Sequence, residues 1–164
     1  MVETNIRNIF LEYPEVIYGF TNIAYSEYAS TYKSALVFAV PYGEQLTIET
    51  YSEEKFENGI QNAKKVLEKI LVQLQKALDE YKVKYYIPPV AQNNEADLIA
   101  PFSFKFAAVN AGLGWIGKND VVITKKYGPR VRLSAILIDS QFGYGQRIIK
   151  SNCPDSCIKC VQSC

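Results

Sequence analysis

The sequence predicts an α/β (α+β) domain over residues 1–150, with a sheet flanked by helices, followed by a cysteine segment over residues 151–164. Residues 32–40 form a near-continuous apolar run that Pro41 ends, as in a strand buried on both faces. From Phe56, apolar residues recur at steps of four and three, which predicts a helix with one apolar face. These patterns together indicate strands covered by helices.

The first half of the domain begins with a short predicted helix over residues 4–12, which Thr4 caps and Pro14 ends. The long helix is expected to run for about 30 residues, or on the order of 45 Å. Thr50 and Glu53 are placed to form a capping box at its start. Its apolar stripe is formed by Phe56, Ile60, Ala63, Leu67, Ile70, Leu74, Ala77 and Tyr81.

The second half of the domain contains shorter elements. A strand is expected over residues 83–87, then a polar loop over 92–95. A second helix is expected from about Pro101 to Ala111, with Gly112 in the left-handed position just beyond its end. Residues 121–124 and 130–139 are expected to be two strands joined by a turn, and residues 140–152 link them to the cysteines.

Composition is that of an ordinary globular protein, with 48% apolar and 21% charged residues. No apolar run reaches the length of a membrane span, and no secretory signal is visible, so a cytoplasmic protein without membrane contact is expected. Residues 1–104 contain nine basic and fourteen acidic side chains, whereas residues 105–150 contain eight basic and two acidic ones. The basic part indicates either a site for phosphate, nucleic acid or an acidic partner, or a solvated face.

All four cysteines lie in the last twelve residues, as Cys153, Cys157, Cys160 and Cys164. Their spacing, Cys-x3-Cys-x2-Cys-x3-Cys, differs by one residue from the ferredoxin run that holds a 4Fe-4S cluster. A structural zinc site usually separates its cysteine pairs by a longer loop or adds histidine, and this chain has no histidine. A cluster is therefore the first hypothesis, with zinc, a disulfide or free thiols as alternatives.

Three glycines, Gly112, Gly114 and Gly117, lie in a block that ends with Lys118 and Asn119. The block matches the dinucleotide pattern Gly-x-Gly-x-x-Gly and most of a P-loop, but both motifs need a strand before the glycines and a helix after them. Here the expected order is helix, glycines, strand, which excludes both. Two interpretations stay open: a helix end with a tight turn around the sole tryptophan, or a loop against a large planar ligand with an anionic group.

Residues 111–119, Ala-Gly-Leu-Gly-Trp-Ile-Gly-Lys-Asn, resemble the signature of the epoxyqueuosine reductases, which are related to the corrinoid-dependent reductive dehalogenases. The resemblance extends through residues 127–133 to the cysteine segment and also covers residues 32–42. It implies a nitroreductase-like mixed sheet that binds cobalamin, followed by ferredoxin-type clusters. A cluster would pass electrons from a ferredoxin or flavodoxin to cobalamin and then to the epoxide of a modified tRNA nucleoside.

The same resemblance assigns the site residues. The four cysteines would ligate the cluster, and the corrinoid would lie against Gly112, Leu113, Gly114, Trp115, Gly117, Lys118 and Asn119. The acid expected three positions before Pro101 is replaced by Leu98, which leaves Asp97 as the candidate proton donor. The relatives continue with a second cysteine run beyond the position of Cys164, so the cysteine segment is expected to be truncated.

The first functional hypothesis is therefore an oxidoreductase of tRNA modification that uses a 4Fe-4S cluster and cobalamin. Loss of the aligned acid favours a non-catalytic electron-transfer or corrinoid-carrying protein instead. Nitroreductase-like folds also hold FMN, which makes an FMN-dependent reductase a third hypothesis. A metal-binding RNA-recognition module that uses the basic residues is the fourth.

Overall fold

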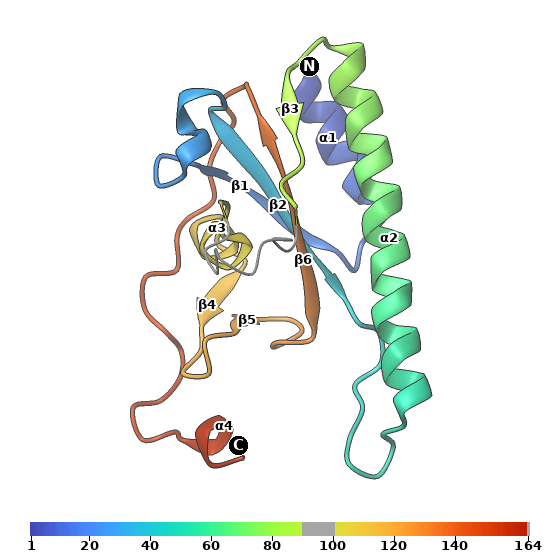
Figure 1. Ribbon diagram of the computed structural model, residues 1–164, viewed down its shortest axis with the longest axis vertical. Helices are drawn as coiled ribbons and strands as arrows, with labels where there is room; N and C mark the ends of the chain where they lie inside the picture. The colour runs from blue at the N-terminus through green and yellow to red at the C-terminus, as the bar shows by residue number, and fades with distance from the viewer. Residues whose placement is uncertain (90–100, 164) are drawn as a thin grey trace.

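The computed structural model describes residues 1–89 and 101–163 of the chain. A four-stranded sheet lies at its centre, in the order β1-β2-β6-β3, and a two-stranded sheet, β4-β5, lies beside it (Figure 1). The helices α1 and α2 cover one side of the central sheet, and α3 covers the other (Figure 1). The elements are α1 (Val2–Leu11), β1 (Ile17–Asn22), the 3₁₀ turn η1 (Glu27–Ser30), β2 (Ser34–Pro41), α2 (Glu53–Glu80), β3 (Tyr85–Tyr86), α3 (Phe104–Asn110), β4 (Gly114–Ile116), β5 (Val122–Thr124), β6 (Val131–Ile138) and α4 (Lys159–Gln162).

Strand β2 is buried on both faces, as its continuous apolar sequence predicts. Leu36, Phe38 and Val40 face the core formed with α1 and α2. The alternate residues Ala35, Val37 and Ala39 face α3 and the β4-β5 hairpin. Because side chains alternate along a strand, one apolar run supplies both cores.

Alanines on both partners allow α3 to pack close to the sheet. Ala107, Ala108 and Ala111 belong to the same core as the alanines of β2. A Cβ atom added at Gly19 of β1 would lie 2.7 Å from the carbonyl oxygen of Ala111. This close packing fixes the position of the segment that follows α3.

Helix α2 spans 28 residues, close to the predicted length, and buries the predicted stripe from Ala63 to Ala77. The predicted ends of the stripe are wrong, because Phe56 and Tyr81 are exposed. The predicted capping box is wrong. Ser52 caps the helix by accepting a hydrogen bond from the Lys55 N–H at 3.2 Å, whereas Thr50 accepts one from the Thr47 N–H at 2.9 Å. The Ser52 hydroxyl reaches the open first turn, while Thr50 lies in the preceding turn. Pro14 follows α1 as expected, but α1 has no side-chain cap, so the predicted Thr4 cap is wrong.

The predicted helix after Pro101 begins later, at Phe104, because Ser103 caps it. Gly112 has φ of +79° and lies just after the helix, as predicted. The strands predicted over 121–124 and 130–139 exist as β5 and β6, but they belong to different sheets. Strand β5 pairs instead with β4, which lies inside the glycine block and was not predicted.

The predicted sheet flanked by helices is confirmed, but every strand pairing in the described ranges is antiparallel, so the expected mixed sheet is not seen there. Strands β2 and β3 run in the same direction, as the α2 connection between them favours. Strand β6 lies between them and runs in the opposite direction.

The predicted strand over residues 83–87 is reduced to Tyr85–Tyr86, because only these residues pair with β6. Strand β1 and the 3₁₀ turn were not predicted, and the predicted loop over 92–95 lies outside the described residues. No helix among the described residues is long and apolar enough to span a membrane.

Candidate functional site: the glycine block and the cysteine segment

The glycine block, residues 112–119, leaves the end of α3 and forms β4. At each of its three glycines, an added Cβ would meet atoms of the chain itself. These atoms are the Gln146 carbonyl oxygen for Gly112, the Ile123 carbonyl oxygen for Gly114, and the Asn119 and Ile123 side chains for Gly117. The glycines therefore allow close packing within the protein, which matches the first interpretation of the block.

The link between β6 and the cysteines, residues 139–152, crosses this block. It is anchored by the Gly145 N–H, which donates to the Phe20 carbonyl at 2.9 Å, and by the stacking of Phe142 on Phe20 at 4.6 Å between ring centroids. A Cβ at Gly145 would collide with the Ala111 carbonyl oxygen. Gly112 and Gly145 thus let two backbone segments touch where the link passes the end of α3.

Lys118, the single cation of the glycine block, reaches the cysteine segment. Its ammonium donates hydrogen bonds to the backbone carbonyl oxygens of Pro154 at 3.0 Å, Asp155 at 2.7 Å and Cys157 at 2.9 Å. A lysine ammonium has three N–H donors, and these three bonds use them all. In this arrangement no N–H of Lys118 is left for an anionic ligand.

Cys153 lies next to the same part of the block. The Ser151 hydroxyl, the backbone N–H of Lys118 and the Trp115 indole, in this order, lower the pKa of the Cys153 thiol, and the charge of Lys118 adds to the effect. The indole N–H is buried and has no hydrogen-bond partner of ordinary geometry among the described residues. The surroundings of this sulfur therefore favour the thiolate.

The three cysteines in the described part of the chain, Cys153, Cys157 and Cys160, are half-buried free thiols. Cys160 lies on α4, and Cys164 lies outside the described residues. Within residues 1–89 and 101–163, no three or more Cys, His, Asp or Glu side chains are assembled as a metal site. The donor chemistry nonetheless suits an iron–sulfur cluster, because thiolates are its ligands and N–H donors commonly surround its sulfurs.

Two of the residues predicted to line a corrinoid pocket make contacts within the protein. Leu113 is buried in the core beneath α3, and the Asn119 side chain accepts a hydrogen bond from the Val121 N–H at 3.4 Å. The candidate acid Asp97, like Leu98, lies outside the described residues.

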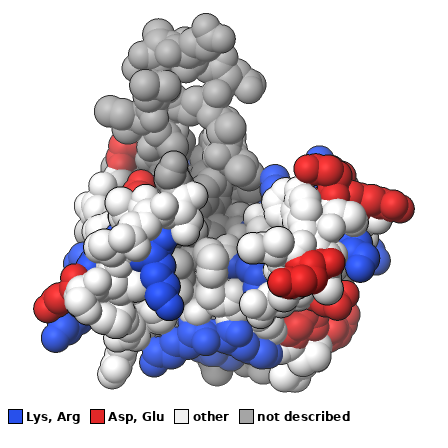
Figure 2. All heavy atoms as spheres, turned by 90° about the horizontal axis from the view of Figure 1, so that it is seen from below, with Lys and Arg blue, Asp and Glu red and all other residues white. Residues whose placement is uncertain are grey.

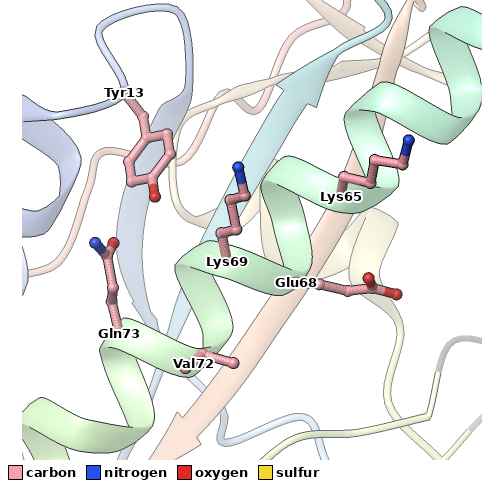
Figure 3. A pocket seen from close by; sticks show the side chains of 6 residues that line it. All are labelled: Tyr13, Lys65, Glu68, Lys69, Val72 and Gln73. Carbon is pink, nitrogen blue, oxygen red and sulfur yellow. The ribbon is translucent and has the colours of Figure 1, made fainter.

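Cavities are present away from this block. A shallow hollow of about 500 Å³ lies between Tyr13 and one face of α2, where Tyr13 points toward the helix (Figure 3). A second cavity, of about 210 Å³, lies at the end of β2 and contains Tyr42, Tyr51 and Arg130 in its lining. A third, of about 340 Å³, lies between β1 and α3. None of these three is lined by residues 112–119.

Charge is unevenly distributed at the end of the molecule that carries α4. Basic side chains form a band across this end, whereas acidic ones gather mainly on the side of α2 (Figure 2). The glycine block contributes Lys118, and the segment after β5 contributes Lys125 and Lys126, to the chain's basic part. All three are exposed.

Two parts of this site are not predicted from the sequence pattern. One is Ser151, whose hydroxyl accepts a hydrogen bond from the Cys153 N–H at 3.1 Å; serine hydroxyls commonly bond to the nearby backbone in this way. The other is Gly145, because its importance depends on a contact with Ala111, far away in the sequence.

The chain is similar in sequence to a curated epoxyqueuosine reductase. The chain is 37% identical over 65 residues to the epoxyqueuosine reductase of Cyclobacterium marinum, a match that covers 40% of this chain and 21% of that protein. No family model matches the sequence.

Solved structures of epoxyqueuosine reductases share the fold. One, from Bacillus subtilis, has its catalytic loop swung out of the active site; it gives a TM-score of 0.68 at 17% identity and covers 100% of this chain. Another, which contains an epoxyqueuosine-modified tRNA stem loop, gives 0.69 at 16% identity over 99% of this chain. The Streptococcus thermophilus enzyme gives 0.64 at 17% identity over 99% of this chain. The chain spans about half the length of these structures, 52% in each case. The resemblance predicted from the glycine block is thus confirmed: the chain is similar in sequence to an epoxyqueuosine reductase and has the epoxyqueuosine reductase fold.

Proposed function

We propose that this chain is an iron–sulfur reductase of the epoxyqueuosine reductase type, which acts on a modified tRNA nucleoside. The observation that carries the proposal is the joining of the glycine block to the cysteine segment by Lys118. It brings the two motifs of the resemblance into contact, although Lys118 and Pro154 lie 36 positions apart in the sequence. Residues 1–150 form the reductase domain in this proposal, and residues 151–164 carry the cluster.

The cluster is assigned to Cys153, Cys157, Cys160 and Cys164, which would bind iron as thiolates. A bound 4Fe-4S cluster supplies one electron at a time. The Trp115 indole and the Lys118 backbone N–H favour negative charge on the Cys153 sulfur, which suits a thiolate ligand. A ferredoxin or flavodoxin is the proposed source of the electrons.

The corrinoid is proposed from the resemblance of residues 111–119 to the epoxyqueuosine reductase signature. The tRNA substrate is supported by the solved relative that contains a tRNA stem loop and by the basic band at the α4 end (Figure 2). Phosphates attract such a band at low salt. Reduction of the tRNA-borne epoxide is the proposed reaction.

The proposal is tested by spectral titration of the anaerobic protein with cobalamin and, in parallel, with FMN. We expect spectral saturation with cobalamin and none with FMN. The loaded protein, supplied with an electron donor, is then expected to consume epoxyqueuosine-modified tRNA. Binding of FMN without cobalamin would replace the proposal by that of an FMN-dependent reductase.

A non-catalytic electron-transfer or corrinoid-carrying protein is the second candidate, because Leu98 occupies the position expected for the acid. An Asp97→Asn variant distinguishes the two. If Asp97 donates the proton, the variant binds cobalamin as the wild type does but loses turnover. Cobalamin binding without turnover in the wild type as well would favour the carrier.

A further inference from the structure

Lys118 binds a turn of the cysteine segment that has its own backbone hydrogen bond. The Cys157 N–H donates to the Pro154 carbonyl at 2.9 Å, which completes a turn over residues 154–157. Three carbonyls of this turn, those of Pro154, Asp155 and Cys157, converge on the Lys118 ammonium. A cation that binds three converging carbonyls fixes both the position and the orientation of the turn.

The contact depends on the lysine and not on a complementary side chain. Asp155 contributes its backbone carbonyl, and the ion pairs found among the described residues do not include Lys118. Lys118 is exposed, so water screens its charge, but hydrogen bonds to a charged donor are stronger than neutral ones. Each such bond typically changes an equilibrium by about tenfold or more.

The position of the turn determines what the first cysteine faces. Cys153 directly precedes Pro154, and Trp115 lies three residues before Lys118. One ammonium group therefore joins the residue that follows Cys153 to the glycine block. We propose that Lys118 is a positioning residue, which docks the 154–157 turn on the glycine block and thereby fixes the position of Cys153 beside the block.

This inference deepens the proposed function, since docking would place the cluster beside the reductase domain. Docking itself requires no cluster, so it is testable in the cluster-free, reduced full-length chain. Trp115 is the sole tryptophan, so its fluorescence reports changes in the surroundings of the glycine block. Lys125 provides a matched control, because it carries the same charge on the segment after β5 and makes none of the three bonds.

The experiment compares Lys118→Met and Lys125→Met with the wild type. For Lys118→Met we expect red-shifted Trp115 emission, stronger quenching by acrylamide, and about tenfold or greater loss of protection of the Cys157 amide in hydrogen exchange. Lys125→Met is expected to match the wild type. Wild-type behaviour of Lys118→Met in all three measurements would overturn the proposal.

A measurement on the unmodified chain keeps the test independent of folding of the variant. Acetic anhydride labels free lysine amines, and an ammonium held by three acceptors reacts slowly. Lys118 is expected to be labelled several-fold more slowly than Lys125, whereas equal rates would contradict docking. Iron analysis is separate from all these readouts, so failure of docking and failure of the proposed cluster are distinguishable.

Discussion

Gly112 lies directly against Gln146: a Cβ atom at Gly112 would be 2.6 Å from the Gln146 carbonyl oxygen. This contact places the link to the cysteines across the end of α3. Together with Lys118 it joins two motifs that are distant in sequence. The glycine block therefore has a packing function that the fold alone explains.

A Gly112→Ala substitution tests this packing. Gly112 combines φ of +79° with the clash against Gln146, whereas Gly128 has φ of +60° and nothing within 4 Å of an added Cβ. We expect Gly128→Ala to cost about 1–2 kcal/mol from backbone strain alone. Gly112→Ala should cost more, because the Gln146 backbone must also move. Urea denaturation measures both, and equal losses would show that the contact is absent.

The reactivity of Cys153 tests the surroundings of its sulfur. The hydrogen bond from Ser151 is the largest cause that lowers the pKa of this thiol, followed by the Lys118 N–H and the Trp115 indole. In the cluster-free chain, the thiolate of Cys153 should therefore form at a lower pH than an ordinary thiol, whose pKa is about 8.5. Iodoacetamide labelling followed by mass spectrometry gives the midpoint. In Ser151→Ala the midpoint should rise, and a midpoint unchanged by this substitution would exclude the Ser151 contribution.

The Trp115 indole predicts a property of the cluster. If its N–H donates to the Cys153 sulfur in the loaded protein, it stabilises the more negative, reduced cluster and raises the reduction potential. Trp115→Phe should lower the potential by about 40 mV, which corresponds to roughly 1 kcal/mol for one electron. Tyr127→Phe is the control, because the Tyr127 hydroxyl donates to the Glu15 carbonyl instead. Redox titration that gives equal potentials for wild type and Trp115→Phe would rule out this donor.

The basic part of the chain predicts how tRNA binds. Replacing Lys125 and Lys126 by glutamine should weaken tRNA binding and lower the salt dependence of log K by about 1.5, if each lysine contacts one phosphate. The control variant replaces Lys64 and Lys65 of α2 by glutamine. It has the same net charge as the first variant, but its changes lie on the other side of the sheet. The tRNA affinity of each variant is measured over a series of salt concentrations. Equal effects would indicate attraction by net charge alone.

The sequence predicts those parts of the fold whose signal is local. The apolar run of β2, the stripe of α2 and the left-handed position of Gly112 were all predicted, because burial and backbone conformation leave direct traces in the residue pattern. The cap of α2 was misplaced by two residues, since Thr50 and Ser52 offer similar hydroxyls and only the local backbone chooses between them.

Features that depend on distant contacts were not predictable in this way. Strand β4 consists of a glycine-rich sequence that becomes a strand only by pairing with β5. The packing of Gly145 against Ala111 requires the link to return across α3. The resemblance assigns Lys118 to a corrinoid pocket, and its bonds to the 154–157 turn could not be inferred from spacing. Assignment of residues 112–119 to a corrinoid stays a prediction.

Metal analysis of the anaerobically purified protein tests most directly the proposal that the cysteine segment holds an iron–sulfur cluster. We expect iron and acid-labile sulfide in equal amounts, about four of each per chain for a cubane cluster, with an electron paramagnetic resonance signal after reduction. The iron and the acid-labile sulfide should both be lost in the Cys153→Ala variant. A colourless protein that contains zinc and no sulfide would contradict the claim.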